Sequence, residues 1–287
     1  MLSRSFQAIR HCSYHQPLRE CSLRTLQPIA RRLYTTETTE EKEQEQKPFR
    51  EPPVVLGLRE PPIVDKSGWL ERKSRKLKDL TDYDKAFAAH AANRRYLVEE
   101  ATRSYYADIH EMRKHGGKMY EASDKLIKAE KAGYMPDFEG MDLLKQHVHT
   151  TDLLTGKITL MSFVYAQYGE SHVKSFIEPF MHHFAQKKDV QQLYLNVQEN
   201  FMKQWILRAF VPSIRKSVPE EQRDKYILLL KDLTRVRRRL DMTNQYIGYV
   251  YLVDEKCRIR WTAHGNATEK EISNMLGMTE YLIQKRQ

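Results

Sequence analysis

Apolar residues recur near every 3.6 positions through residues 81–115, a spacing that predicts one long helix. The pair Gly116–Gly117 predicts where that helix ends. Residues 35–66 show no such period and mix Thr, Glu, Gln and Pro, with two Glu-Pro-Pro steps. Because such a composition buries too little apolar surface to fold, it predicts a disordered linker. A basic stretch and the long helix then occupy residues 67–130.

Beyond residue 131 the pattern alternates between strands and helices. Apolar runs and alternating positions predict strands at 157–165, 190–197, 226–230, 249–253 and 257–261. Helical spacing predicts helices from residue 171 with a kink at Pro179, at 201–210 with an end near Pro212, at 233–240, and after a capping box of Thr268 and Glu271. The second strand is expected to lie parallel to the first. This order predicts an α/β, thioredoxin-like domain with a helical insertion at residues 131–287.

The first 34 residues have the composition of a mitochondrial transit peptide. They hold six Arg, no Lys and one acidic residue, Glu20, and Arg interrupts every short apolar cluster. The segment 32–35, Arg-Leu-Tyr-Thr, also resembles a matrix-protease cleavage site. Cleavage after Tyr34 would remove two of the three cysteines and leave Cys257, which alone can form neither an internal disulfide nor a CxxC pair.

The formal charge of +10 is concentrated in one part of the chain. Between residues 203 and 239 eleven Lys or Arg face four acidic residues, and the run ends with Arg235, Arg237, Arg238 and Arg239. Three interpretations stay open: a solvated face, binding to anionic lipid headgroups, and binding to RNA. The aromatic residues Trp205 and Tyr226 are expected on apolar faces and not between the arginines, so stacking on RNA bases is the weakest of the three.

Several short segments resemble peroxiredoxins and the copper-delivering relatives of thioredoxin. These are Pro136-Asp137-Phe138, Gly156-Lys157, and Val253-Asp254 with Gly265 beyond. Such proteins act through thiolates at the end of the first strand. The corresponding segment here, residues 166–172, has no cysteine, and Ile247-Gly248 stands where thioredoxins place a cis-proline. Redox catalysis by that mechanism is therefore excluded.

No other catalytic chemistry is evident. The sequence has no phosphate-binding glycine loop, nucleophile elbow or HExxH motif. Five histidines lack a thiolate or paired carboxylate nearby and are expected to be surface or packing residues: His147, His149, His172, His182 and His183. Cys257 is expected to be an ordinary strand residue. We expect no catalytic residue, metal or cofactor, although a residual redox or copper role for Cys257 and nearby histidines stays open.

The residues also resemble one particular family. The segment 247–261, with Tyr-Val-Tyr-Leu followed by Cys-Arg-Ile-Arg-Trp, is similar to the most characteristic segment of the mitochondrial ATPase complex assembly factors that attend the newly made a subunit (subunit six) of the ATP synthase Fo sector. Further matches are residues 80–85, the stretch from Glu199-Asn200 to Trp205, and Ser213 with Arg215. The resemblance spans roughly residues 60–285, and it departs at Thr262-Ala263-His264-Gly265, where relatives have a turn of small residues.

The resemblance implies a chaperone and not an enzyme. Such a protein would lie peripherally on the matrix side of the inner mitochondrial membrane, bind subunit a and promote its association with the c-ring, with no nucleic acid expected. Arg258, Arg260 and Trp261 are predicted partner contacts, although a structural role in the sheet is favoured for Trp261. Arg235 and Arg237–Arg239 are the predicted basic patch for membrane or partner. The alternative is an RNA- or ribosome-associated mitochondrial protein.

Overall fold

The computed structural model describes residues 50–65 except 54, the positions 67, 70, 71, 74, 78 and 94, and residues 107–286. These residues all belong to one compact unit. The predicted leader at 1–34 lies outside the described residues. So does most of the predicted long helix, of which α3 (Ala107–His115) is described. The predicted helix end is confirmed: Gly116 and Gly117 take positive φ angles of 57° and 81°, and the amide of Gly117 donates to the carbonyl of Met112.

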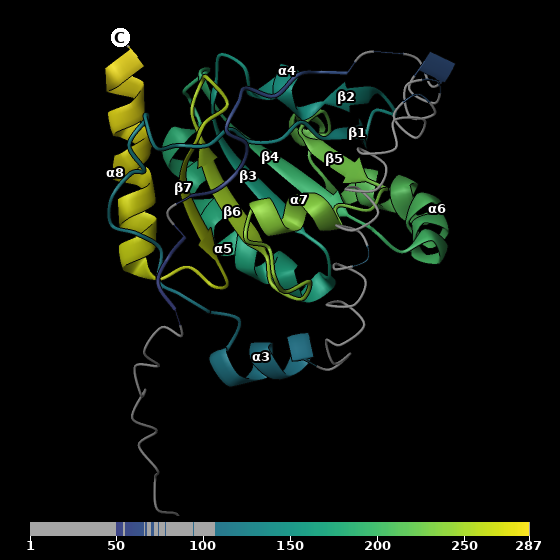
Figure 1. The fold of residues 1–287 in the computed structure, drawn as a ribbon, viewed down its shortest axis with the longest axis horizontal. Coiled ribbons are helices and arrows are strands. Elements are labelled where there is room, and N and C mark those ends of the chain that lie inside the picture. Colours follow the sequence, from purple (N-terminus) through teal and green to yellow (C-terminus); the bar gives the residue numbers. More distant parts are fainter. Residues whose placement is uncertain are drawn as a thin grey trace, which may run out of the picture. The chain divides into compact units, whose positions relative to one another are not determined.

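The described residues form a seven-stranded sheet in the order β2-β1-β5-β4-β3-β6-β7 (Figure 1). The strands are β1 (Glu139–Asp142), β2 (His147–His149), β3 (Ile158–Val164), β4 (Val190–Val197), β5 (Tyr226–Leu229), β6 (Tyr249–Val253) and β7 (Ile259–His264). β3, β4 and β5 are parallel, and the remaining neighbours pair antiparallel. All seven residues of β3 are buried, as its continuous apolar run predicts for a central strand.

The thioredoxin-like prediction is confirmed by the connections between these strands. β3 continues into α5 (Gln167–Phe184) and then into the parallel strand β4, while the β6–β7 hairpin leads to α8 (Glu269–Arg286). The capping box of α8 forms as predicted: the amide of Thr268 donates to Glu271 at 3.0 Å, and the amide of Glu271 donates to the Thr268 hydroxyl at 3.2 Å. A helical insertion, α6 (Phe201–Ser217) and the 3₁₀ turn η1 (Glu220–Gln222), joins β4 to β5.

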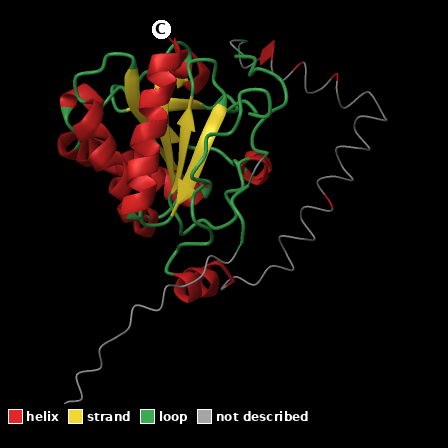
Figure 2. Ribbon diagram, turned by 90° about the vertical axis from the view of Figure 1, so that its left-hand side faces the viewer, coloured by secondary structure: helices red, strands yellow, loops and turns green. Residues whose placement is uncertain are grey.

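Two hydrophobic cores flank the sheet. On one face α5 and α8 pack through Phe176, Phe180 and Met275, whereas the other face is covered by α4 (Thr150–Leu154), α7 (Thr234–Arg239) and loops. Figure 2 shows the longer helices gathered on one side of the strands and mostly loop on the other. α6 packs separately, against β1 and β5, through Leu207, Val211 and Ile214.

Three sequence-based element predictions were wrong in detail. α6 continues five residues beyond Pro212, because its buried stripe continues to Ile214 and Val218 on the far side of the proline. α5 begins at Gln167, four residues before the predicted start, so the segment 166–172 is mostly helical. The β1–β2 hairpin was missed because strands of four and three residues are too short to show a period.

The predicted disordered linker is wrong for the part of it that the structure describes. Leu56 is 3% exposed, and Leu58 forms a backbone bridge with Tyr134, with both hydrogen bonds at 2.8 Å. The amide of Gly57 donates to the carbonyl of Arg239, and Arg50 forms a two-bonded ion pair with Asp241. The described residues of 50–65 therefore belong to the folded unit. Their contacts with distant residues offset the conformational entropy that is lost when this segment becomes ordered.

Candidate functional site

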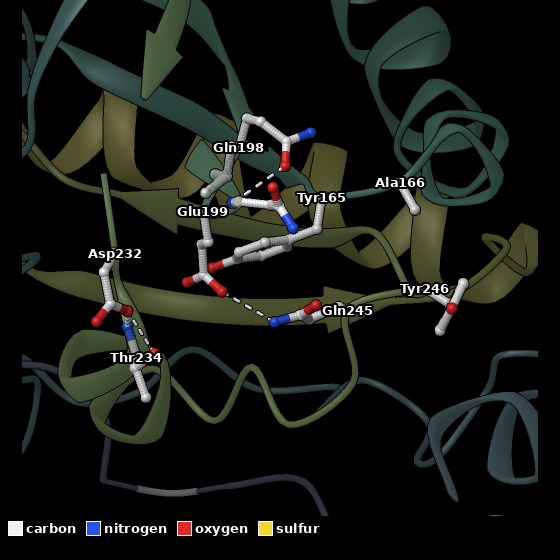
Figure 3. Close-up of a pocket in the computed structure, with 10 residues that line it drawn as sticks. Tyr165, Ala166, Gln198, Glu199, Asp232, Thr234, Gln245 and Tyr246 are labelled. Carbon is white, nitrogen blue, oxygen red and sulfur yellow. Dashed lines mark hydrogen bonds between the residues drawn. The ribbon is translucent and has the colours of Figure 1, made fainter. Parts of the chain in front are cut away.

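A crevice opens at the carboxyl ends of β3 and β4 (Figure 3). Tyr165 and Ala166, which follow β3, and residues 198–200, which follow β4, form one side of it. Asp232 and Thr234 near the start of α7, with Gln245 and Tyr246 before β6, form the other side. The crevice is open to solvent and has a volume of about 510 Å³. Ligands of open α/β sheets bind outside the carboxyl ends of the parallel strands. This position makes the crevice the candidate functional site.

Glu199 ties three walls of the crevice together. One carboxylate oxygen accepts hydrogen bonds from Arg237 at 3.0 Å and from the side-chain amide of Gln245 at 2.9 Å. The other oxygen accepts from the amide of Leu233 at 3.1 Å. The carboxylate thus joins the end of β4 to α7 and to the loop before β6, as Figure 3 shows for Gln245. Because Arg237 is 7% exposed, this ion pair holds the walls and presents little charge to the crevice.

Tyr165 gives the crevice a neutral aromatic floor. Burial raises its pKa well above the ordinary value, and the nearby Glu199 carboxylate adds to the effect, while the Arg237 cation opposes it. The phenol therefore keeps its proton at neutral pH. Its hydroxyl donates to the sulfur of Met242 at 3.7 Å, and its ring lies 5.7 Å from the Arg237 guanidinium. Such a floor can pack against a bound chain.

The first turn of α5, where thioredoxin-like enzymes place their thiols, is closed by backbone contact. Gly169 and Gly248 touch: a Cβ added at Gly248 would lie 2.3 Å from the carbonyl oxygen of Gly169. Gly248 is thus found at the predicted equivalent of the cis-proline, beside α5. Its peptide bond, like every other in the described part of the chain, is trans. The turn holds no cysteine, so it lacks the thiol chemistry of those enzymes.

Cys257 lies at the other end of the sheet from the crevice. It follows β6, whereas the crevice residues Gln245 and Tyr246 precede that strand. Its side chain is buried in a turn with a positive φ of 62°, and burial raises the pKa of the thiol. A raised pKa reduces the thiolate fraction on which nucleophilic and metal-binding chemistry depends.

The histidines are dispersed among separate contacts. His149 bonds Asp137 at 2.6 Å, His183 bonds Glu280 at 2.7 Å, and His172 accepts from the amide of Gly248 at 3.3 Å. Within residues 107–286 and the shorter described segments, no group of three or more His, Cys, Asp or Glu side chains could hold a metal ion.

His264 should make stability depend on pH. The ring is completely buried, accepts a hydrogen bond from the amide of Met119 at 2.7 Å, and has a pKa well below 6.5 because of burial and the nearby cations Lys118 and Arg50. Below pH 6.5 the His264 ring is therefore protonated in the unfolded chain but stays neutral in the folded chain. Stability consequently falls as pH falls. We expect this residue to contribute a loss of about 1–2 kcal/mol between pH 6.5 and about pH 5.

Urea denaturation of the full chain and of a His264→Gln variant at the two pH values measures this contribution. Whatever the variant's stability at pH 6.5, its loss of stability on acidification should be smaller than that of the original chain. Parallel losses would show that His264 is protonated in the folded state.

The predicted contact residues on β7 are engaged inside the fold. The indole nitrogen of Trp261 donates to the carbonyl of Ser123 at 2.8 Å, and the side chain is 1% exposed. Arg260 is 5% exposed, donates to the carbonyl of Ile127 at 2.8 Å and pairs with Asp254 at 3.2 Å. Arg258, which is half-buried, pairs with the same carboxylate at 2.9 Å. The favoured structural role of Trp261 agrees with this position, whereas partner binding by the three residues stays a prediction.

The predicted basic patch divides into two parts. Arg237 points inward to Glu199, while Arg235, Arg238 and Arg239 are exposed on α7, the helix whose first residue lines the crevice. Glu199 and Gln245 are not among the site residues predicted from the sequence. A usable signal was present at Gln198-Glu199-Asn200, three polar residues directly after an apolar strand.

Comparison with known proteins decides the family. The model of the ATP10 protein family matches residues 34–282. The chain belongs to the ATP10 family. It is 28% identical over 189 residues, 66% of this chain and 69% of the relative, to a probable mitochondrial ATPase complex subunit atp10 of Schizosaccharomyces pombe. It is 26% identical to the mitochondrial ATPase complex subunit ATP10 of Saccharomyces cerevisiae, over 70% of this chain and 78% of that one.

Two solved structures show a weak similarity to the chain. A putative thiol:disulfide interchange protein DsbE of Chlorobium tepidum has a TM-score of 0.37 at 12% identity, covering 53% of this chain and 96% of that one. A SCO1/SenC family lipoprotein of Bacillus anthracis has a TM-score of 0.38 at 16% identity, covering 51% and 93%. No function is taken from either protein, and the fold assignment of this ATP10 family member rests on its own strand order.

Proposed function

We propose that the chain is an assembly factor for the mitochondrial ATP synthase and not an enzyme. It binds newly made Fo subunit a and promotes its association with the c-ring. One observation carries the proposal. In a chain of the ATP10 family, the crevice lies where redox-active thioredoxin-like proteins have their thiols, and no cysteine lines it. A site of this kind can bind a polypeptide, and none of the residues that line it is a cysteine.

The relatives and the leader support the proposed location. The relatives are named as mitochondrial ATPase complex subunits, and the family match begins at residue 34, where the predicted transit peptide ends. Subunit a is a membrane protein, so its assembly factor acts at the inner membrane. We place the chain peripherally on the matrix side of that membrane.

The contact surface proposed for subunit a is the crevice with its basic rim. Arg235, Arg238 and Arg239 lie on α7, whose start forms one wall, and they can meet acidic residues or carbonyl oxygens of a partner. The proposal also includes Arg258, Arg260 and Trp261 as partner contacts. These side chains are less accessible, and a partner would have to compete with the contacts they make inside the chain.

Crosslinking in mitochondria tests this function. The tagged chain is recovered after radiolabelling of newly made organelle-encoded proteins, in its original form and as Ala166→Tyr, which places a large side chain in the crevice without removing a side-chain hydrogen bond. Ala185→Tyr, at the other end of α5, is the matched control. We expect labelled subunit a as the main product, with recovery reduced about tenfold by Ala166→Tyr alone.

Each result bears on a different part of the proposal. Labelled products of many sizes, or none, would contradict an assembly role for subunit a. Equal recovery with both variants would retain the role and move the site away from the crevice. Cells that lack the chain should keep an ATPase head that hydrolyses ATP with poor sensitivity to an Fo inhibitor, and a fully coupled enzyme in those cells would contradict the function itself.

The exposed arginines of α7 also support a second candidate, an RNA- or ribosome-associated protein. Binding of that kind weakens steeply with salt, because neutralised phosphates release counterions. Sedimentation with mitochondrial ribosomes and crosslinking to RNA at low salt would favour it. The absence of both would leave the assembly role.

A further inference from the structure

α6 is an amphipathic helix with a second apolar stripe on its solvent side. Trp205, Ile206 and Phe210 are 66%, 58% and 58% exposed. Phe210 lies four residues after Ile206, and Ala209 lies four after Trp205, so the stripe follows the helix for more than a turn. Scattered exposed apolar residues are ordinary, but three large ones side by side on one helix form a patch that marks an interaction surface.

The opposite side of α6 fixes the direction in which this stripe points. Leu207, Val211 and Ile214 pack on Leu143, which follows β1, and on Leu228 of β5. Arg215 strengthens the attachment, because its guanidinium donates to the carbonyl of Leu143. In Figure 1, α6 lies at the side of the sheet away from α8. These contacts hold the exposed stripe outward. Among the described residues, Trp205, Ile206 and Phe210 are not part of a hydrophobic core.

The charge of α6 identifies the kind of surface that suits the stripe. The helix contains four basic residues, Lys203, Arg208, Arg215 and Lys216, and no acidic residue. Arg208 lies three residues after Trp205 and Lys216 lies eleven after it, so both stand on the Trp205 side of the stripe, and both are exposed. Large apolar side chains beside Lys and Arg, without acidic residues, are typical of helices that lie in a membrane interface.

We propose that the exposed face of α6 docks the chain on an anionic lipid surface. Trp205, Ile206 and Phe210 enter the boundary between headgroups and acyl chains, while Arg208 and Lys216 contact anionic headgroups. Among the residues that the structure describes, no helix is both long and apolar enough to cross a membrane, so α6 lies along the surface.

The docked helix would place the crevice close to the membrane. Asn200, which lines the crevice, immediately precedes α6. The inference rests on the proposed function in one respect: it assigns the proposed peripheral location to a specific surface, the exposed face of α6. Lipid binding is measured without any client, and so it can fail while the crosslinking to subunit a succeeds, or succeed while that crosslinking fails.

Flotation with vesicles tests the docking. The full chain is mixed with vesicles of phosphatidylcholine containing about one third phosphatidylglycerol, or with vesicles of phosphatidylcholine alone. We expect binding to the anionic vesicles to fall at least about tenfold when Trp205, Ile206 and Phe210 are all replaced by Ser. Replacing Arg208 or Lys216 by Gln should weaken it roughly fivefold for each charge, with little effect on the weaker binding to neutral vesicles.

A matched control replaces three exposed apolar residues that lie outside α6, namely Val55, Ile63 and Tyr281, by Ser. It should bind like the original chain. Far-ultraviolet circular dichroism and urea denaturation establish that every variant is folded. The fluorescence emission of Trp205 gives an independent signal and should shift to the blue on anionic vesicles. It is obtained by subtracting the emission of a Trp205→Phe variant from that of the original chain.

Three outcomes would overturn the proposal. The first is failure of the original chain to float with anionic vesicles, and the second is flotation of the Ser variant equal to that of the original. The third, in mitochondria, is reaction of a photo-crosslinker at position 206 with a protein and not with lipid. The last result would make the stripe a docking surface for a partner chain or for a second copy.

Discussion

Replacing Asp254 by Asn is expected to lower the free energy of unfolding by about 3–5 kcal/mol. The carboxylate is 1% exposed and lies in the turn of the β6–β7 hairpin. It accepts hydrogen bonds from the guanidinium groups of Arg258 at 2.9 Å and Arg260 at 3.2 Å, and from the backbone amides of Lys256 and Arg258. Asn keeps the size of the side chain and removes the charge.

The size of this effect follows from Arg260. Its side chain is almost as buried as that of Asp254, so the substitution leaves a guanidinium cation inside the protein without its counter-ion. Asp124→Asn is the matched control, because that carboxylate pairs with Lys270 on the surface and should leave the urea midpoint nearly unchanged. If the two variants had similar midpoints, water would have to reach Arg260.

The parts of the fold that rest on long apolar patterns could be predicted from the sequence. β3 and β4, the parallel pairing between them, the β6–β7 hairpin and the capped helix α8 all follow from local spacing. The docking of residues 50–65 could not be predicted in this way. It depends on partners such as Tyr134 and Asp241, which are 76 and 191 positions away from Leu58 and Arg50 and leave no local signature.

The same limit applies to the candidate site. Its position after β3 and its lack of cysteine can be predicted from the sequence, because both depend only on the residues that directly follow that strand. The tie between Glu199, Arg237 and Gln245 depends on two loops and helix α7, which meet only in the fold. Arg260 and Trp261 have the residue types of contact hot spots. Residues 123–127, which cover them, are distant in the sequence, so residue type alone could not reveal their burial.

Trp261→Ala is expected to lower the free energy of unfolding by about 3–5 kcal/mol, because it empties a large site in a packed core. The indole packs edge-on against Phe176 at 6.1 Å between ring centroids. It also satisfies the carbonyl of Ser123. Trp261→Phe should cost less, about 1–3 kcal/mol, since the ring fills much of the space but leaves that carbonyl without its donor. Urea denaturation of the full chain measures both.

Trp205→Ala supplies the control, because it is the same substitution on a side chain that is 66% exposed. It should change stability by no more than about 0.5 kcal/mol and weaken binding to anionic vesicles, whereas Trp261→Ala should lower stability. The two tryptophans would then separate packing from docking. If Trp261→Ala left the urea midpoint unchanged and abolished crosslinking to subunit a, the indole would be a partner contact, and its burial in the free chain would have to open when the partner binds.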